Sequence, residues 1–537
     1  MSEPARTIDP AATAATSGAG SAGEGSEGRG RRARGGADAR RAARLGGGVK
    51  HLRNIVRTIP PYEVLSLEAL EIIEANADIV LEEVGIDFRG DEEVLALWRD
   101  AGADVQGERI HFPKGLCRQL VTEHAPKTFT QHARNPERTV EIGGNNTVFA
   151  PVYGPPFVRD LDHGRRYGTI EDFRNFVKLA YMTPAMHHSG GTVCEPVDVP
   201  VNKRHLDMVH AHLRWSDKAV MGSVTAPERA EDSIELCRLA FGRDFVADNC
   251  VILGNVNVNS PLVYDVTMTG ALKTYARANQ GTVVVPFILG GAMGPVTTAG
   301  AIAQSHAEAM AGVALTQLVR PGAPAVYGSF LSSLSLRTGA PTFGMPEPAL
   351  SHLVVGQLAR RLGVPLRCGG ALTGSKVADA QAAQESSDAI LTACLGGANF
   401  VLHAAGWLEG GLTVGYEKFV LDCDRLGMLH TFLAGLPLDD NALAMEAFRE
   451  IGPGRHYLGA GHTLKNYETA FYDSDLASNE SFEQWQEAGE KDANRRAAER
   501  CRALLASYEP PPIDAGVEEA LSDFVARRKA EMADAWY

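Results

Sequence analysis

Residues 251–291 read VILGNVNVNSPLVYDVTMTGALKTYARANQGTVVVPFILGG. The stretch opens with the apolar run Val251–Asn255, continues through a segment long enough for a helix, and closes with the apolar run Val283–Ile288. A short continuous apolar run is typical of a strand that is buried on both faces of a parallel sheet. The runs end at residues 255 and 288, which leaves room for a helix and two loops between them. We therefore expect one β–α–β unit here.

The same pattern repeats on both sides of this unit. Apolar runs alternate with helix-length segments from residue 148 to residue 437, and successive runs end 32 to 41 residues apart. The eight runs are Phe149–Tyr153, Met186–Gly190, Ala219–Gly222, Val251–Asn255, Val283–Ile288, Ala325–Tyr327, Pro365–Cys368 and Phe400–His403. Eight strand–helix units over roughly 250 residues suit a closed barrel better than an open sheet. The predicted fold is an α/β protein built on a (β/α)8 TIM barrel.

Three further segments flank the predicted barrel. Residues 1–50 consist mostly of Gly, Ala, Ser and Arg, and we expect them to be a disordered tail because they offer almost no apolar surface to bury. Residues 51–147 combine two amphipathic helical patterns with short extended runs, which predicts a small N-terminal α/β domain. Residues 438–537 read as a C-terminal helical extension that covers one barrel end or forms a dimer contact, and we expect a homo-oligomer.

Composition excludes several classes of function. The formal charge of -14 argues against nucleic acid or an anionic membrane as the main partner. The eight cysteines include no C-x-x-C pair, and no apolar run is long enough to span a membrane, so we expect a cytoplasmic protein with free thiols. No phosphate-binding or dinucleotide-binding loop is present. His187 and His188 are adjacent and point to opposite faces of a strand, so no metal site is predicted.

The active site of such a barrel lies at the carboxyl ends of its strands. Aromatic side chains gather there, and aromatic ring faces attract quaternary ammonium groups. Asparagine side chains there can hydrogen-bond a substrate carboxylate, and His403 and Glu409 are candidate acids. Paired glycines after strands two, five and seven suggest a broad, open binding face. The substrate-binding candidates are Tyr153, Asn255, Asn257, Tyr327, Phe330, Trp407 and Tyr416, and the glycines are Gly190, Gly191, Gly290, Gly291, Gly369 and Gly370.

Four long stretches resemble the trimethylamine methyltransferase (MttB) family. They are residues 327–348, 372–387, 400–429 and 457–473, and the resemblance runs from about residue 51 to the C-terminus. Some members carry pyrrolysine, whereas this chain contains only the twenty standard residues, so it resembles the non-pyrrolysine branch. That branch takes a methyl group from quaternary amines such as glycine betaine, proline betaine or carnitine. The resemblance implies transfer to the Co(I) corrinoid of a partner protein, with the paired glycines as its docking face and no tightly bound cofactor.

The chemistry of a quaternary amine fits these residues. Its nitrogen is already cationic, so a nucleophile can attack a methyl group directly, and the enzyme has to hold and orient the cation and exclude water. His403 or Glu409 would then protonate the released amine. Several alternatives stay open at this point. They are a corrinoid methyltransferase acting on trimethylamine, another N-methyl compound or a sulfonium, a non-catalytic betaine-binding protein, and a metal-dependent barrel hydrolase or lyase.

Overall fold

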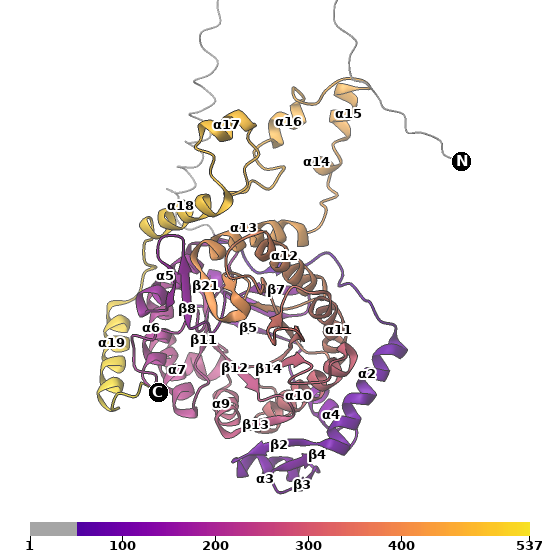
Figure 1. Cartoon of the computed structure of the whole chain (residues 1–537), viewed down its shortest axis with the longest axis vertical. Helices are drawn as coiled ribbons and strands as arrows, with labels where there is room; N and C mark the ends of the chain where they lie inside the picture. Colours follow the sequence, from indigo (N-terminus) through magenta and orange to yellow (C-terminus); the bar gives the residue numbers. More distant parts are fainter. Residues whose placement is uncertain (1–50, 537) are drawn as a thin grey trace, which may run out of the picture. The chain divides into compact units, whose positions relative to one another are not determined.

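The computed structural model describes residues 51–536, so the predicted disordered tail at residues 1–50 lies outside the described part of the chain. Eight parallel strands form the central sheet (Figure 1). They are β7 (Asn146–Phe149), β10 (His188–Gly190), β11 (Ala219–Gly222), β12 (Ile252–Val258), β14 (Gly281–Gly290), β15 (Ala325–Gly328), β18 (Leu366–Gly369) and β19 (Phe400–Leu402). Their hydrogen-bonded order is β7-β19-β18-β15-β14-β12-β11-β10, which is the order around a (β/α)8 barrel.

The sheet curls in barrel order, but one of its seams lacks a ladder. Seven of the eight neighbouring strand pairs have parallel backbone pairing, and within residues 51–536 no ladder joins β7 to β10. The free edge of β7 is taken instead by the antiparallel strand β1 (Ile55–Val56). Side chain and loop contacts bridge the seam, since Phe149 N donates to His187 Nδ1 (3.0 Å) and Gly154 N donates to the Thr192 carbonyl (2.6 Å). The described fold is therefore a mixed α/β fold with a curled parallel sheet.

The first strand lies earlier in the chain than predicted. We expected it at residues 149–153, and β7 covers residues 146–149. Pro151 interrupts the predicted run because a proline has no N–H to donate to a ladder. The residues on either side of it still bond to the last strand, since Ala150 N donates to the Val401 carbonyl at 3.0 Å.

A long helix follows each strand, as the repeat predicted, and a second, short helix, α8 (Arg243–Asp248), follows α7 before β12. The eight helices are α5 (Ile170–Met182), α6 (Arg204–Trp215), α7 (Pro227–Phe241), α9 (Val266–Arg277), α10 (Thr298–Val319), α11 (Pro346–Leu362), α12 (Ala380–Leu395) and α13 (Tyr416–Leu433). Helix α5 shows why these segments start where they do. The Thr169 side chain accepts from the backbone of Asp172, and the Asp172 side chain accepts from the backbone of Thr169, which together form a capping box.

Residues before β7 form an α/β layer against α10. The layer contains α2 (Leu67–Ile79), a π-helical turn (Val80–Val84), β2 (Ile86–Arg89), α3 (Glu92–Asp100), β3 (Asp104–Gln106), β4 (Arg109–His111) and α4 (Leu116–His124). The hairpin of β5 (Thr128–Gln131) and β6 (Val140–Gly143) packs instead on the inner core of the sheet, where Gln131 Nε2 donates to the Val220 carbonyl at 2.8 Å. Strand β13 (Val263–Asp265), which follows β12, pairs with β2 and links the layer to the sheet. Helices α2, α3 and α4 all contact α10, so α10 is buried from Ala301 to Gln317. A side chain at Gly312 would collide with the Tyr264 hydroxyl and Val284.

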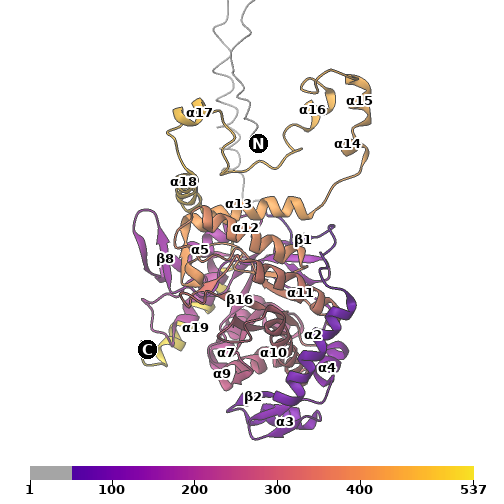
Figure 2. The same ribbon diagram turned by 45° about the vertical axis from the view of Figure 1, so that its right-hand side comes forward.

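The C-terminal region is helical, with more breaks than predicted. Helices α14 (Asp440–Leu443), α15 (Met445–Ile451), α16 (Gly461–Asn466) and α17 (Phe482–Glu487) precede α18 (Ala493–Ala506) and α19 (Ala515–Ala530). The predicted helix near residues 482–508 is two helices, because the chain turns at Gly489, which has a φ of 95°. Helix α18 packs on α13 and α5, and α19 packs on α6 and α7. The segment carrying α14–α16 stands away from the sheet in Figures 1 and 2.

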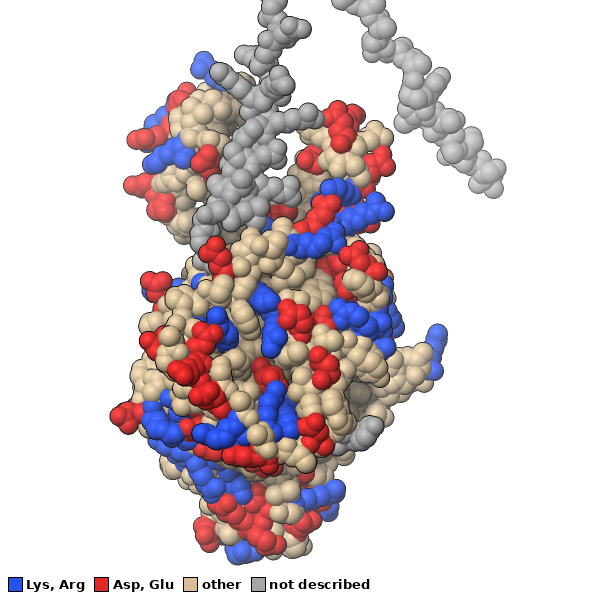
Figure 3. Space-filling model, turned by 90° about the vertical axis from the view of Figure 1, so that its left-hand side faces the viewer, with Lys and Arg blue, Asp and Glu red and all other residues tan. Residues whose placement is uncertain are grey.

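The surface carries mixed charge. Acidic and basic side chains are interspersed over the face shown in Figure 3, without a large field of one sign. None of the helices between residues 51 and 536 is long and apolar enough to cross a membrane.

Candidate functional site

The carboxyl ends of the parallel strands meet at one end of the curled sheet, which we call the mouth. Short hairpins added after three strands surround it, and strand β8 of one hairpin pairs with β21 of another. These strands are β8 (Phe157–Asp160), β9 (Gly164–Tyr167), β16 (Phe330–Leu334), β17 (Pro341–Thr342), β20 (Trp407–Leu408) and β21 (Thr413–Gly415). The loops of this end carry the chemistry in barrel enzymes.

Four rings, from the segments that follow β15 and β19, pack together at the mouth. They are Phe330, Phe343, His403 and Trp407, which we call the aromatic cluster. The ring of Phe330 stacks on His403, with centroids 5.2 Å apart and an interplanar angle of 25°, and on Phe343 at 5.5 Å. Trp407 meets His403 edge-on at 4.5 Å and Phe330 at 5.7 Å. The sequence analysis placed Phe330, His403 and Trp407 at this end of the sheet. Phe343 is a fourth ring that it did not predict.

His403 is a neutral hydrogen-bonding group in this cluster. The backbone N–H of Tyr153 donates to His403 Nδ1 at 3.1 Å, so the ring proton sits on Nε2. Burial, together with the nearby Arg367 guanidinium, holds the pKa of His403 well below its ordinary value. His403 adopts a left-handed backbone with a φ of 62°, which turns the chain sharply after β19. A histidine that stays neutral at physiological pH donates hydrogen bonds but is a poor source of protons.

Arg367 is a charged side chain inside the sheet. Its strand neighbours Leu366 and Cys368 pack in the outer core, so alternation along β18 turns Arg367 inward. The guanidinium lies 5.0 Å from the Phe330 ring centre, and Nη1 donates to the Ser329 carbonyl at 3.1 Å. Burial lowers the pKa of Arg367 to about 10, so it stays charged at neutral pH. Its Nε has no hydrogen-bond partner among the described residues.

Buried polar atoms of Asn255 and Trp407, near the strand ends, also lack partners within residues 51–536. Asn255 donates from Nδ2 to Asn257 Oδ1 at 3.2 Å, and its own Oδ1 has no donor. The indole N–H of Trp407 has no acceptor. An unsatisfied buried polar atom costs about 1–3 kcal/mol, so each of these atoms marks a place where a ligand could restore a hydrogen bond.

Glu409 is ion-paired at the edge of the mouth. Its Oε2 accepts from Arg165 Nε at 2.7 Å and from the Thr413 hydroxyl at 2.6 Å. Partial burial alone would raise the pKa of Glu409, but these two bonds outweigh it and hold the pKa below its ordinary value. The carboxylate therefore joins two hairpins and is not a proton donor at neutral pH.

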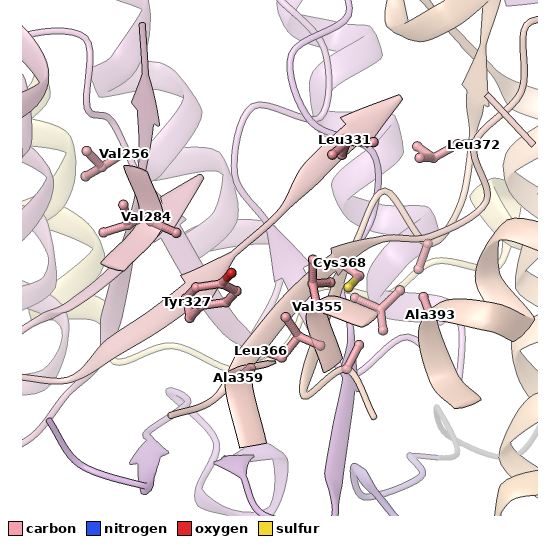
Figure 4. Close-up of a cluster of buried hydrophobic side chains, with 14 of the residues drawn as sticks. Val256, Val284, Tyr327, Leu331, Val355, Ala359, Leu366, Cys368, Leu372 and Ala393 are labelled. Carbon is pink, nitrogen blue, oxygen red and sulfur yellow. The ribbon is translucent and has the colours of Figure 1, made fainter. Parts of the chain in front are cut away.

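Two predicted substrate-binding tyrosines, Tyr327 and Tyr416, lie away from the mouth. Tyr327 packs between the sheet and α10 in the apolar cluster of Figure 4, and its hydroxyl lies 3.0 Å from His306 Nδ1. Val326, next to it, packs in the core inside the curled sheet, so Tyr327 must face outward. Tyr416 donates to Asp172 Oδ1 at 2.8 Å and stacks on Phe176 at 4.4 Å, in the layer between α5 and α13. Tyr153 packs beside the inner core near the seam.

Four of the six predicted docking glycines are buried. A side chain at Gly190 would collide with Pro151, one at Gly191 with Tyr153, one at Gly369 with Leu372 and one at Gly370 with the Ala404 backbone. These four glycines, which the sequence analysis assigned to the docking face, allow segments of this chain to pack closely. Gly290 and Gly291 do lie at the rim of the mouth.

The rim beside Gly291 is apolar. Leu336 and Val296 both lie next to Gly291, and the two residues are 76% and 68% exposed. A separate cavity of about 540 Å³ lies outside the mouth, between α12, α13 and the start of α18, and no member of the aromatic cluster lines it. Among residues 51–536, no group of three or more His, Cys, Asp or Glu side chains is placed to hold a metal ion.

Sequence reasoning missed Arg367 and Phe343. Arg367 stood inside the run Pro365–Cys368, and a charge within a strand expected to be buried on both faces was a usable signal. Phe343 lies in a loop, and nothing in its sequence surroundings distinguished it from a packing residue.

Comparison with known proteins places this site in context. The family model described as trimethylamine methyltransferase (MTTB) matches residues 31–533. The chain is 40% identical to glycine betaine methyltransferase of Desulfitobacterium hafniense (strain Y51), over 89% of this chain and 99% of that protein. It is 27% identical to proline betaine:corrinoid methyltransferase of Eubacterium limosum, over 86% and 96% respectively. The solved Methanosarcina barkeri monomethylamine methyltransferase aligns with a TM-score of 0.45 and 12% identity, covering 83% of this chain and 93% of that one.

Proposed function

The chain belongs to the trimethylamine methyltransferase family, and on that premise we propose that it transfers a methyl group from a betaine to the cobalt(I) corrinoid of a partner protein. The relatives named for glycine betaine and proline betaine act on quaternary amines that also carry a carboxylate. The betaine class is therefore favoured over trimethylamine, which has no carboxylate.

One observation carries this proposal, namely the aromatic cluster beside the buried Arg367. The rings of Phe330, Phe343 and Trp407 lie together at the mouth, and a quaternary ammonium that packs against such rings gains about 0.5–2 kcal/mol for each good contact. The Arg367 guanidinium lies 5.0 Å from the Phe330 ring centre and has an unused Nε–H. A carboxylate bonded to Arg367 would leave the ammonium end of a small betaine within reach of the rings. Asn255 and Asn257 remain candidates for the same polar end.

The residues of this chain bind the betaine and orient its methyl group, and the reaction requires no proton transfer. The methyl carbon bonds to cobalt(I) as its bond to nitrogen breaks, and the electron pair of that bond leaves on a neutral tertiary amine. The rings stabilise the positive charge before the step, and alignment of one methyl group with the cobalt lowers the barrier. His403 is neutral and Glu409 is ion-paired, so we assign them orienting roles in place of the acid role expected from the sequence.

We further propose that the corrinoid protein docks on the rim that carries Gly290, Gly291, Val296 and Leu336. This rim is exposed, apolar and next to the mouth, where the cobalt has to arrive. The proposal also includes a barrel that is functionally closed, with the β7–β10 seam sealed by side chains. No corrinoid site is proposed on this chain itself, because the corrinoid enters as the methyl acceptor.

The test is a methyl-transfer assay on the full chain. The purified protein is mixed with a reduced corrinoid protein and, in turn, glycine betaine, proline betaine, carnitine, trimethylamine and a sulfonium, while the visible spectrum is followed. We expect conversion of cobalt(I) to methylcobalt with a betaine and not with trimethylamine. Conversion with only trimethylamine or a sulfonium would overturn the betaine proposal. Betaine binding in calorimetry without conversion would instead favour the non-catalytic betaine-binding protein.

A further inference from the structure

Residues 436–471 form an arm that exposes large apolar side chains. Leu436, Leu458 and Phe471 are 83%, 82% and 85% exposed, respectively. The arm exposes ten large apolar side chains in this way, namely Leu436, Leu438, Leu443, Met445, Phe448, Tyr457, Leu458, Leu464, Tyr467 and Phe471. Figures 1 and 2 show this segment, with α14–α16, standing away from the rest of the described chain. Apolar side chains at this density are unusual on a surface that faces only water.

The arm has its own internal structure. Asn441 Nδ2 donates to Asn466 Oδ1 at 2.9 Å, and His462 Nε2 lies 2.7 Å from the Asn441 carbonyl, which ties α14 to α16. Ala447 and Ala460 are its buried apolar residues. Polar bonds thus hold the shape while the large side chains point outward, so the arm is pre-organised for a contact that the single chain does not make.

The far end of the arm is fixed to the body. Tyr472 donates to the Asp424 carbonyl at 3.0 Å, and the Ser474 hydroxyl donates to Asp424 Oδ2 at 2.6 Å. Arg500 of α18 pairs with Asp475 at 2.8 Å. The segment that follows the arm is therefore held on α13 and α18.

We propose that this arm packs against a second copy of the chain. The ten side chains expose on the order of 1,000 Å², given that a large aromatic side chain buries about 150–250 Å². A standard interface needs about 800 Å² from each partner, so the arm alone is large enough. In a two-fold dimer the same arm is used twice, which doubles the contact.

A second copy of the chain is a better candidate for the partner of the arm than the corrinoid protein. Helix α13 follows β19 and runs back along the sheet, so the arm leaves from the end opposite the mouth. A corrinoid protein has to present its cobalt at the mouth. The arm carries five acidic and three basic side chains, too balanced a charge to select a strongly charged partner. Apolar content with little net charge is typical of contacts between identical subunits.

The experiment measures mass in solution. Sedimentation of the full chain is expected to give a multiple of the 57.4 kDa chain mass. The double variant Leu458→Asp, Phe471→Asp should weaken self-association at least ~10-fold, because two charges would have to be buried in the contact. The matched control is Leu336→Asp, a leucine of similar exposure at the rim, which should leave the mass unchanged.

Circular dichroism and the melting temperature show whether the double variant is folded. If it is not, a photo-crosslinking residue at position 458 in the otherwise unchanged chain should give covalent dimers. A wild-type chain that sediments as a monomer would overturn the proposal, as would a folded double variant with unchanged mass. A double variant that keeps its mass and loses binding of the corrinoid protein would assign the arm to that partner instead. The methyl-transfer assay above is independent of these outcomes.

Discussion

Replacement of Arg367 with methionine is expected to weaken binding of glycine betaine while leaving binding of choline unchanged. Choline carries the same trimethylammonium group but an alcohol in place of the carboxylate, so it uses the aromatic cluster without needing the guanidinium. Methionine nearly fills the space of the arginine stem and removes the charge. The comparison of two ligands in one variant separates the carboxylate contact from any general change in the mouth.

The magnitude follows from the contacts of Arg367. Its Nε–H has no partner now, so a carboxylate would gain a charge-assisted hydrogen bond without breaking the bond to Ser329. Such bonds contribute about 1.5–3 kcal/mol. At 1.4 kcal/mol for each factor of ten, the Kd for glycine betaine should rise about 10- to 150-fold. Arg367→Lys keeps the charge but loses the planar fork, and we expect an intermediate loss.

Calorimetry with both ligands is the assay, and thermal unfolding is its control. Methionine leaves the Ser329 carbonyl without its donor, which costs about 1–3 kcal/mol of folding stability, so the variant has to be compared at a temperature where it is fully folded. A folded Arg367→Met protein that binds glycine betaine as tightly as the wild type would refute the assignment. Equal losses for glycine betaine and choline would show that the substitution disturbs the mouth as a whole.

Other predictions concern the rings, the rim and the buried histidines. Trp407→Leu should raise the KM for the betaine about 2- to 30-fold, from a lost contact of 0.5–2 kcal/mol, with a smaller change in kcat; an unchanged KM would remove Trp407 from the site. Leu336→Asp should slow methylation of the corrinoid protein but not of free cobalamin, and equal slowing of both would contradict rim docking. Burial lowers the pKa of His212 and His352 to about 4 and that of His306 to about 3, so only the unfolded chain gains protons as the pH falls below 6.5. Each of these three histidines should therefore lower the free energy of unfolding by about 2 kcal/mol between pH 7 and pH 5. The urea midpoints of unfolding at pH 7 and pH 5 should differ less in His352→Gln than in the wild type.

The repeat along the chain predicted the strands well because each parallel strand is buried on both faces. A continuous apolar run such as Val283–Ile288 indicates a strand that is covered on both faces, so its position could be predicted from the sequence. The edge of the sheet could not be predicted in this way. Strand β1 has two residues, too few for a pattern, and it occupies the edge of β7 on which closure of the predicted barrel depends.

The site was harder to predict because a side chain changes face with each step along a strand. Tyr327 and Phe330 are three residues apart, and only their register decides that Phe330 joins the mouth and Tyr327 the outer core. Glycines were equally ambiguous, since Gly190 and Gly291 look alike in sequence and only contacts distinguish a buried close approach from an exposed rim. Arg367 could have been found, because a lone charge within a buried strand needs a reason.

The enclosure of α10 has a consequence during synthesis. The layer formed by α2, α3 and α4 covers α10, yet α4 ends at His124 and α10 begins at Thr298. At about 5–20 residues per second, the ribosome adds the intervening stretch in roughly 10–30 s. For that time the nascent layer has apolar side chains such as Leu81 and Val121 but not the helix that will cover them. The newborn chain is then a substrate for chaperones that bind apolar segments, and slower translation before Thr298 would lengthen that exposure.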